Sequence, residues 1–136
     1  MKAKTSRSSA GLQSLVITII LVIGFNAALA KGVTKRIRFA RGSNSAVVEG
    51  AVIRGDMDRY ILGARAGQEM TVSITSEEDN AVFHIYRPGA KKTLEGAGED
   101  QDATEWSGKL PAAGDYVIVV GGTRGNATYK LSVKVE

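Results

Sequence analysis

Side chains suited to catalysis or zinc binding are scarce in this sequence. The only histidine, His84, lies between Phe83 and Ile85 in an alternating pattern, which is typical of a strand residue rather than of a general base. A zinc site needs several histidines or cysteines, and the chain has no cysteine. A hydrolytic serine needs a base and an orienting acid, and no G-x-S-x-G motif is present. We therefore expect a protein that is not an enzyme, with no catalytic residues, no metal site and no cofactor.

Carboxylates leave one further kind of site open, a calcium site. Asp56 and Asp58 follow Gly55, but they lack the regular spacing of oxygen ligands that an EF-hand loop has. Turn-forming carboxylates are the better interpretation of this pair. Other loop acids that could bind calcium are Asp79, Glu99, Asp100 and Asp102. A calcium-stabilised structural domain therefore remains an alternative.

A different chemistry is suggested by Asp115–Val135, which reads as two strands around a glycine-rich turn. Residues 116–120 are a continuous apolar run, which predicts a strand at the centre of a sheet. Residues 129–135 alternate apolar and polar side chains, which predicts a strand with one buried face. The turn residues suited to positive φ angles are Gly121, Gly122, Gly125 and Asn126. We predict a hairpin that presents Arg124, a long cation, at its tip.

Residues 1–30 have the pattern of a secretory signal peptide. Lys2, Lys4 and Arg7 precede an apolar run at 15–25 that is too short to span a membrane as a helix, and Ala28-Leu29-Ala30 provides small residues for cleavage. We expect cleavage after Ala30 and a periplasmic or secreted domain of residues 31–136, with no membrane association. Without cysteine, this domain must be stabilised by its core alone.

The basic charge of the chain comes mostly from the signal peptide. Removing its three cations from the 18 lysines and arginines leaves 15 against 14 acids, a net charge of about +1. This balance gives no reason to expect a nucleic-acid partner. We expect a monomer, although an unpaired edge strand could pair with a second copy.

Short strand patterns separated by turn signals fill the exported part of the chain. The expected strands are Lys35–Ala40, Ala46–Arg54, Arg59–Ala66, Met70–Thr75, Ala81–Arg87, Thr104–Leu110 and the two C-terminal ones. Gly50, inside the second strand, indicates a bulge or close packing. By its polar composition, Thr93–Ala103 is expected to be the least ordered part. The fold predicted is an all-β, antiparallel sandwich of about eight strands, similar to a jelly roll.

The order of turn and core motifs resembles the bacterial pre-peptidase C-terminal domain, a small exported β-sandwich. The motifs that carry this resemblance are Gly55-Asp56-x-Asp58-x-Tyr60, Ala66-Gly67-Gln68, Leu110-Pro111-Ala112-x-Gly114-Asp115-Tyr116 and Thr128-Tyr129-x-Leu131. They span nearly the whole exported chain. They are specific for a fold and only weakly specific for a function.

Within that group the chain looks most like the periplasmic inhibitors of g-type (goose-type) lysozyme. It resembles them in its free-standing domain behind a signal peptide, in Arg38-Phe39-Ala40-Arg41-Gly42-x-x-Ser45-Ala46, and in Thr123-Arg124 near Asn126. The resemblance implies that loops enter the lysozyme's substrate cleft and that Arg124 engages its acidic groups. Where the family pattern has a second arginine this chain has Thr128, and where it has a loop tyrosine the chain has a shorter Gly55-Asp56-Met57 turn.

The resemblance therefore implies a g-type lysozyme as the protein partner and a contact centred on Arg124. The residues expected to bind that partner are Arg124, Thr123, Asn126, Gly122 and Asp56. The alternative is a non-catalytic module that binds a carbohydrate or cell-wall ligand. In that case Trp106 and Tyr86 would stack against sugar rings, although the only tryptophan of a small sandwich is more often buried.

Overall fold

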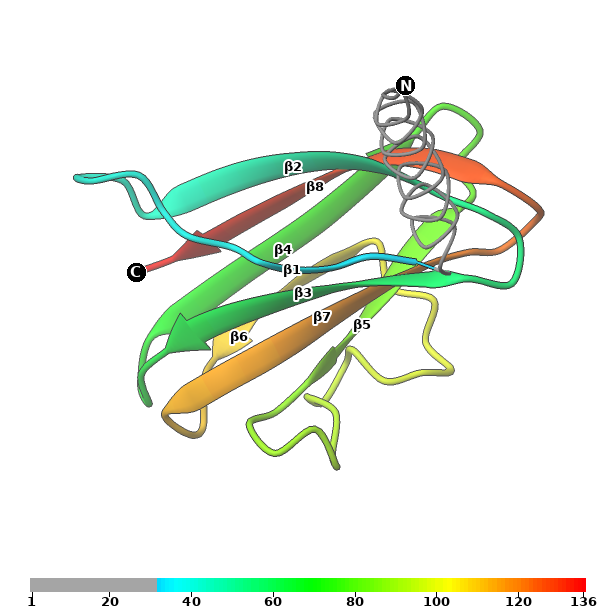
Figure 1. Ribbon diagram of the computed structural model, residues 1–136. Helices are drawn as coiled ribbons and strands as arrows, with labels where there is room; N and C mark the ends of the chain where they lie inside the picture. Colours follow the sequence, from blue (N-terminus) through cyan, green and yellow to red (C-terminus); the bar gives the residue numbers. More distant parts are fainter. Residues whose placement is uncertain (1–31) are drawn as a thin grey trace, which may run out of the picture. The chain divides into compact units, whose positions relative to one another are not determined.

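Alternating apolar and polar side chains give most strands one face to bury, and the chain buries these faces between two stacked sheets (Figure 1). The computed structural model describes residues 32–136, so the signal peptide predicted at residues 1–30 lies outside them. The strands are β1 (Thr34–Arg36), β2 (Ser45–Val52), β3 (Met57–Ala64), β4 (Glu69–Ser76), β5 (Ala81–Tyr86), β6 (Glu105–Lys109), β7 (Gly114–Gly122) and β8 (Ala127–Val135). This confirms the predicted all-β sandwich. No helix within residues 32–136 is long and apolar enough to cross a membrane.

Consecutive strands always lie in opposite sheets. One sheet has the order β1-β3-β7-β5 and the other the order β2-β8-β4-β6, so every connection in the described chain crosses from one sheet to the other. The prediction that β7 and β8 form a hairpin is therefore wrong. β7 pairs with β3 and β5, whereas β8 pairs with β2 and β4. The turn that carries Arg124, residues 123–126, instead connects one sheet to the other, and we call it the arch.

One strand pair departs from the antiparallel pattern. β1 pairs in parallel with β3, from Thr34 opposite Arg59 to Arg36 opposite Ile61. The strand predicted over Lys35–Ala40 is cut short because the chain leaves this sheet after Ile37, whose N–H donates to the carbonyl of Ile61 over 2.8 Å. Ile37 is buried and Phe39 packs partly buried against the core, so both side chains point inward as expected.

The core lies between the sheets and follows the predicted alternation. Met70, Val72 and Ile74 of β4 are buried, as are Tyr129, Leu131, Val133 and Val135 of β8. Gly50 provides close packing rather than a bulge, because β2 and β8 keep an unbroken register. A Cβ atom at residue 50 would lie 2.5 Å from the hydroxyl oxygen of Tyr129. The glycine therefore makes room for the tyrosine.

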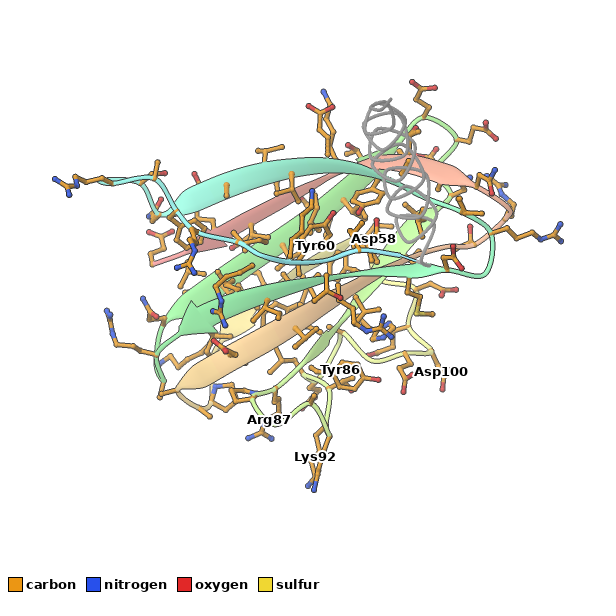
Figure 2. All side chains as sticks on the ribbon, viewed as in Figure 1. Asp58, Tyr60, Tyr86, Arg87, Lys92 and Asp100 are labelled. Atoms are coloured by element: carbon orange, nitrogen blue, oxygen red, sulfur yellow. The ribbon has the colours of Figure 1, made fainter. Side chains whose placement is uncertain are left out.

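Asp58 is not a turn residue, as the sequence had suggested, but a buried residue of β3. It is 2% exposed and sits between the sheets beside Tyr60 (Figure 2). The Tyr129 hydroxyl donates to its Oδ2 atom over 2.5 Å, and the Val33 N–H donates to its Oδ1 atom over 3.0 Å. These bonds satisfy a carboxyl group whose burial would otherwise be costly.

The connection from β5 to β6 is more ordered than its composition suggested. Leu94, Ala97 and Ala103 are buried, and the connection bonds to the edge of β5. The Phe83 N–H donates to the Ala103 carbonyl over 2.9 Å, and the Ile85 N–H donates to the Ala97 carbonyl over 3.0 Å. Apolar residues at intervals in a polar segment hold it against the sheet and cover an edge strand.

Candidate functional site

Three loops meet at the end of the sandwich on the right of Figure 1, and we call them the tip loops. They are residues 53–56 between β2 and β3, 77–80 between β4 and β5, and 123–126 between β7 and β8. They come together because β2, β4 and β7 all run toward this end, as their antiparallel pairing with β8 and β3 requires. All five residues expected to bind a partner lie in or beside the tip loops.

Asn80 holds two of these loops together. Its side chain is 2% exposed, and its Nδ2 atom donates to the carbonyls of Asn126 over 2.9 Å and Arg124 over 3.3 Å. In return, the Thr123 N–H donates to the Asn80 carbonyl over 2.9 Å. These three bonds, two of them partly buried, restrain the backbone of residues 123–126.

Asn126 connects the third loop. Its Oδ1 atom accepts the N–H of Arg54 over 2.7 Å, which joins the arch to the β2–β3 turn. That turn closes with a bond from the Asp56 N–H to the Ile53 carbonyl over 2.8 Å. Asp56 is half-buried in this turn. Asn126 thus positions the arch, with its side chain engaged on the protein's own backbone.

Arg124 is exposed on the arch, but its guanidinium does not extend freely. Its Nη2 atom donates to the backbone carbonyl of Glu78 in the adjacent tip loop. A guanidinium has five N–H donors, so most of the donors of Arg124 remain available to another partner. The two ion pairs found in residues 32–136 join Arg36 to Asp115 and Lys134 to Glu136. Within the part of the chain that the structure describes, Arg124 is therefore a positioned cation without a carboxylate partner.

Glycines shape the arch in two different ways. Gly125 has a φ of +70°, as the sequence predicted for the turn. Gly121 and Gly122 instead belong to β7, and neither they nor Asn126 have positive φ angles, so that prediction was wrong for these three residues. A Cβ at Gly122 would lie 2.7 Å from the Gly125 carbonyl oxygen, so its role is to let the arch fold back closely. Thr123 is exposed beside it.

Apolar side chains and carboxylates surround the arch. Ile53 is 63% exposed and Met57 is 43% exposed, and both lie at this end of the sandwich. Ile53 borders a groove of about 390 Å³ together with Glu77, Glu78 and Asn126. Thr123 borders a second groove of about 460 Å³, whose other lining residues include Met57, Asp100 and Asp102. Residues of the arch thus border two grooves that each combine an exposed apolar residue with carboxylates.

Sequence reasoning missed Asn80, Ile53 and Met57. Nothing in the residues next to Asn80 shows that it is buried, with its side chain bonded to residues 44 and 46 positions further on. Ile53 could have been found, because the alternation in β2 places it on the face opposite the core.

The other residues considered for chemistry are dispersed. His84 and Tyr86 lie on the outer face of β5, with their rings 5.4 Å apart and edge to face. Burial lowers the pKa of His84, and the nearby Glu99 opposes this shift. Trp106 is half-buried on β6, in the other sheet, so it forms no common platform with Tyr86. No three histidine or acidic side chains of the described chain gather as cation ligands.

Comparison with known proteins gives matches over most of the chain. No family model matches it. A curated relative, the inhibitor of g-type lysozyme of Escherichia coli K12, is 27% identical over 123 residues, which cover 87% of this chain and 91% of that protein.

Solved structures extend the comparison to the fold. The periplasmic inhibitor of g-type lysozyme from Aeromonas hydrophila, PliG, is 34% identical, with a TM-score of 0.66 over 79% of this chain and 100% of that one. The pre-peptidase C-terminal domain of a Bacillus anthracis collagenase is similar in fold, with a TM-score of 0.59 at 20% identity over 77% of this chain and 98% of that domain. Both resemblances drawn from the sequence are therefore confirmed.

Proposed function

The chain belongs to the family of periplasmic inhibitors of g-type lysozyme, and we propose that it inhibits a g-type lysozyme itself, in the periplasm. The relatives are inhibitors by name, not enzymes. The observation that supports a binding role for the tip loops is the set of hydrogen bonds that joins them. Three loops that connect the two sheets are joined by side-chain to backbone hydrogen bonds through Asn80 and Asn126. A surface fixed before binding loses less conformational entropy when a partner docks.

We propose that Arg124 is the central contact. A lysozyme cleft holds carboxylates, and a guanidinium offers planar paired donors that match a carboxylate. Arg124 sits on an arch at the end of a rigid sandwich, which allows it to reach into a concave site. Its bond to the Glu78 carbonyl uses one donor and restrains the side chain, so fewer rotamers are lost on binding.

The other expected contact residues would act beside Arg124. Thr123 is exposed next to it and would contact the partner directly. Gly122 and Asn126 would act mainly by positioning the arch, through the close approach to Gly125 and the bond from the Arg54 N–H. Asp56, in the β2–β3 turn, would lie at the margin of the contact.

Inhibition assays test this proposal at two levels. Wild-type protein should inhibit a g-type lysozyme at micromolar concentration or below and leave a hen-type lysozyme active. Arg124→Ala should weaken inhibition by at least about 30-fold, the effect of a hot spot worth about 2 kcal/mol. Arg124→Lys should recover only part of this loss, because a lysine cannot donate bidentately. Arg41→Ala, an exposed arginine between β1 and β2, is the matched control.

The outcomes separate the function from its mechanism. Absence of inhibition by the wild type would contradict the function. Full inhibition by Arg124→Ala, with an unchanged melting temperature, would leave the function standing and refute the role of the arginine.

A further inference from the structure

A third recess, larger than the two grooves beside the arch, is lined by none of the five residues assigned to the lysozyme contact. It has a volume of about 1010 Å³ and runs between β6, an edge strand, and the connection from β5 to β6. Trp106 is among its lining residues. The charged and amide side chains that line it with Trp106 are Arg87, Glu95, Gln101, Glu105 and Lys109. We call this recess the β6 groove.

The indole ring of Trp106 is fixed in the β6 groove by contacts on several sides. Its Nε1 atom donates to the Glu95 carbonyl over 2.9 Å. A Cβ atom at Gly108 would lie 2.8 Å from the ring, and one at Gly96 would lie 3.3 Å from Nε1. Glycine at these positions allows the ring to pack against the backbone, while the side chain stays partly exposed. An aromatic surface is therefore in place before any ligand binds.

The charges of the β6 groove balance. Arg87 and Lys109 are matched by Glu95 and Glu105, so a polyanion or a polycation would meet like charges as well as opposite ones. A neutral ligand with an apolar face and many hydroxyls suits this arrangement. The apolar face of a sugar ring packs on an aromatic side chain, and its hydroxyls both donate to carboxylates and accept from guanidinium or ammonium groups.

We propose that the β6 groove binds a neutral glycan, with a sugar ring against Trp106 and with hydroxyls held by Arg87 and Lys109. Arg87 is half-buried and directed away from the sheets in Figure 2, and Lys109 is exposed on β6. The groove thus combines one aromatic side chain with cations and carboxylates. This site is independent of lysozyme inhibition, because none of its residues belongs to the proposed lysozyme contact.

Tryptophan fluorescence tests this site directly, because Trp106 is the only tryptophan in the chain. Titration with chitotetraose or cellotetraose should change its emission in a saturable way. Tetragalacturonate, a charged oligosaccharide of the same length, should cause no saturable change. The proposal is overturned if neither neutral oligosaccharide changes the emission up to about 10 mM, a range that includes weak binding. Equal binding of the charged oligosaccharide also overturns it.

A variant that keeps the ring removes the risk of misfolding. The double substitution Arg87→Ala and Lys109→Ala leaves Trp106 in place and should weaken binding about tenfold or more, as expected for lost hydrogen bonds to charged groups. The double substitution Lys35→Ala and Arg41→Ala removes two exposed cations elsewhere and should bind like the wild type. Equal affinity of the two double variants, with equal melting temperatures, would refute the assignment.

Discussion

The hydroxyl of Tyr129 on β8 donates a hydrogen bond of 2.5 Å to Oδ2 of Asp58 on β3, and so joins the two sheets inside the core. The hydroxyls of Tyr129 and Tyr60 lie 2.6 Å apart, which adds a third member to this network. Burial raises the pKa of Tyr129, and its bonds to Asp58 and Tyr60 raise it further. The phenol therefore stays protonated well into the alkaline range and remains a donor to Asp58.

Tyr129→Phe should destabilise the protein without changing its fold. The substitution removes the donor to Asp58 and leaves a buried carboxyl oxygen unsatisfied, at a cost of about 2 kcal/mol. Urea denaturation monitored by circular dichroism measures this change. Tyr60→Phe is the control, since it leaves the bond between Tyr129 and Asp58 intact and should cost less. Equal losses of unfolding free energy in the two variants would contradict the larger contribution assigned to the Tyr129–Asp58 bond.

Gly50→Ala should be destabilising by about 1 to 3 kcal/mol, the usual cost of overpacking a core. The added methyl group would meet the Tyr129 hydroxyl oxygen at 2.5 Å. Gly63→Ala in β3 is a matched control, because its nearest contact would be an ordinary 3.5 Å from Asp115. Thermal unfolding of both variants makes the comparison. A Gly50→Ala protein as stable as Gly63→Ala would show that the tyrosine can move aside.

Asn80→Ala should affect both stability and inhibition. It leaves the carbonyls of Arg124 and Asn126 without their donor and frees the arch, at a cost of about 2 kcal/mol in unfolding free energy. Inhibition of g-type lysozyme should weaken although Asn80 itself is buried. Asn44→Ala, at an exposed asparagine between β1 and β2, should leave both properties unchanged. Unchanged inhibition by Asn80→Ala would contradict the proposal that the hydrogen bonds of Asn80 hold the arch in its binding conformation.

Mild acid should lower the stability of the protein through His84. Burial lowers the pKa of this ring below its ordinary value of 6.5, so the unfolded chain binds the proton more readily than the folded one. Stability is therefore retained above that value and falls as the pH drops through 6.5 toward the lower folded-state pKa. Melting temperatures between neutral pH and the range where carboxylates titrate measure the slope. His84→Gln should flatten it, and an unchanged slope would assign the effect to another group.

The positions of most strands, and the faces that they bury, follow from the amino-acid sequence alone. Alternation with a period of two identified the inward side chains of β4 and β8, and the run at Tyr116–Val120 identified a central strand, now seen as β7 with neighbours on both sides. Motifs at the turns identified the family. These features are local, because each depends on the side chains of a few consecutive residues.

The pairing of the strands and the contacts between loops could not be read from the sequence. The alternation of apolar and polar side chains shows that one face of a strand is buried, but it does not show which strand lies next to it. For this reason the arch at Arg124 was predicted as a hairpin, although β7 and β8 lie in different sheets. Asp58 looked like a turn residue because its partner, Tyr129, lies 71 residues away in the sequence. Asn80 looked like one more loop residue for the same reason. Contacts between distant residues arise from the stacking of the two sheets, which no local pattern specifies.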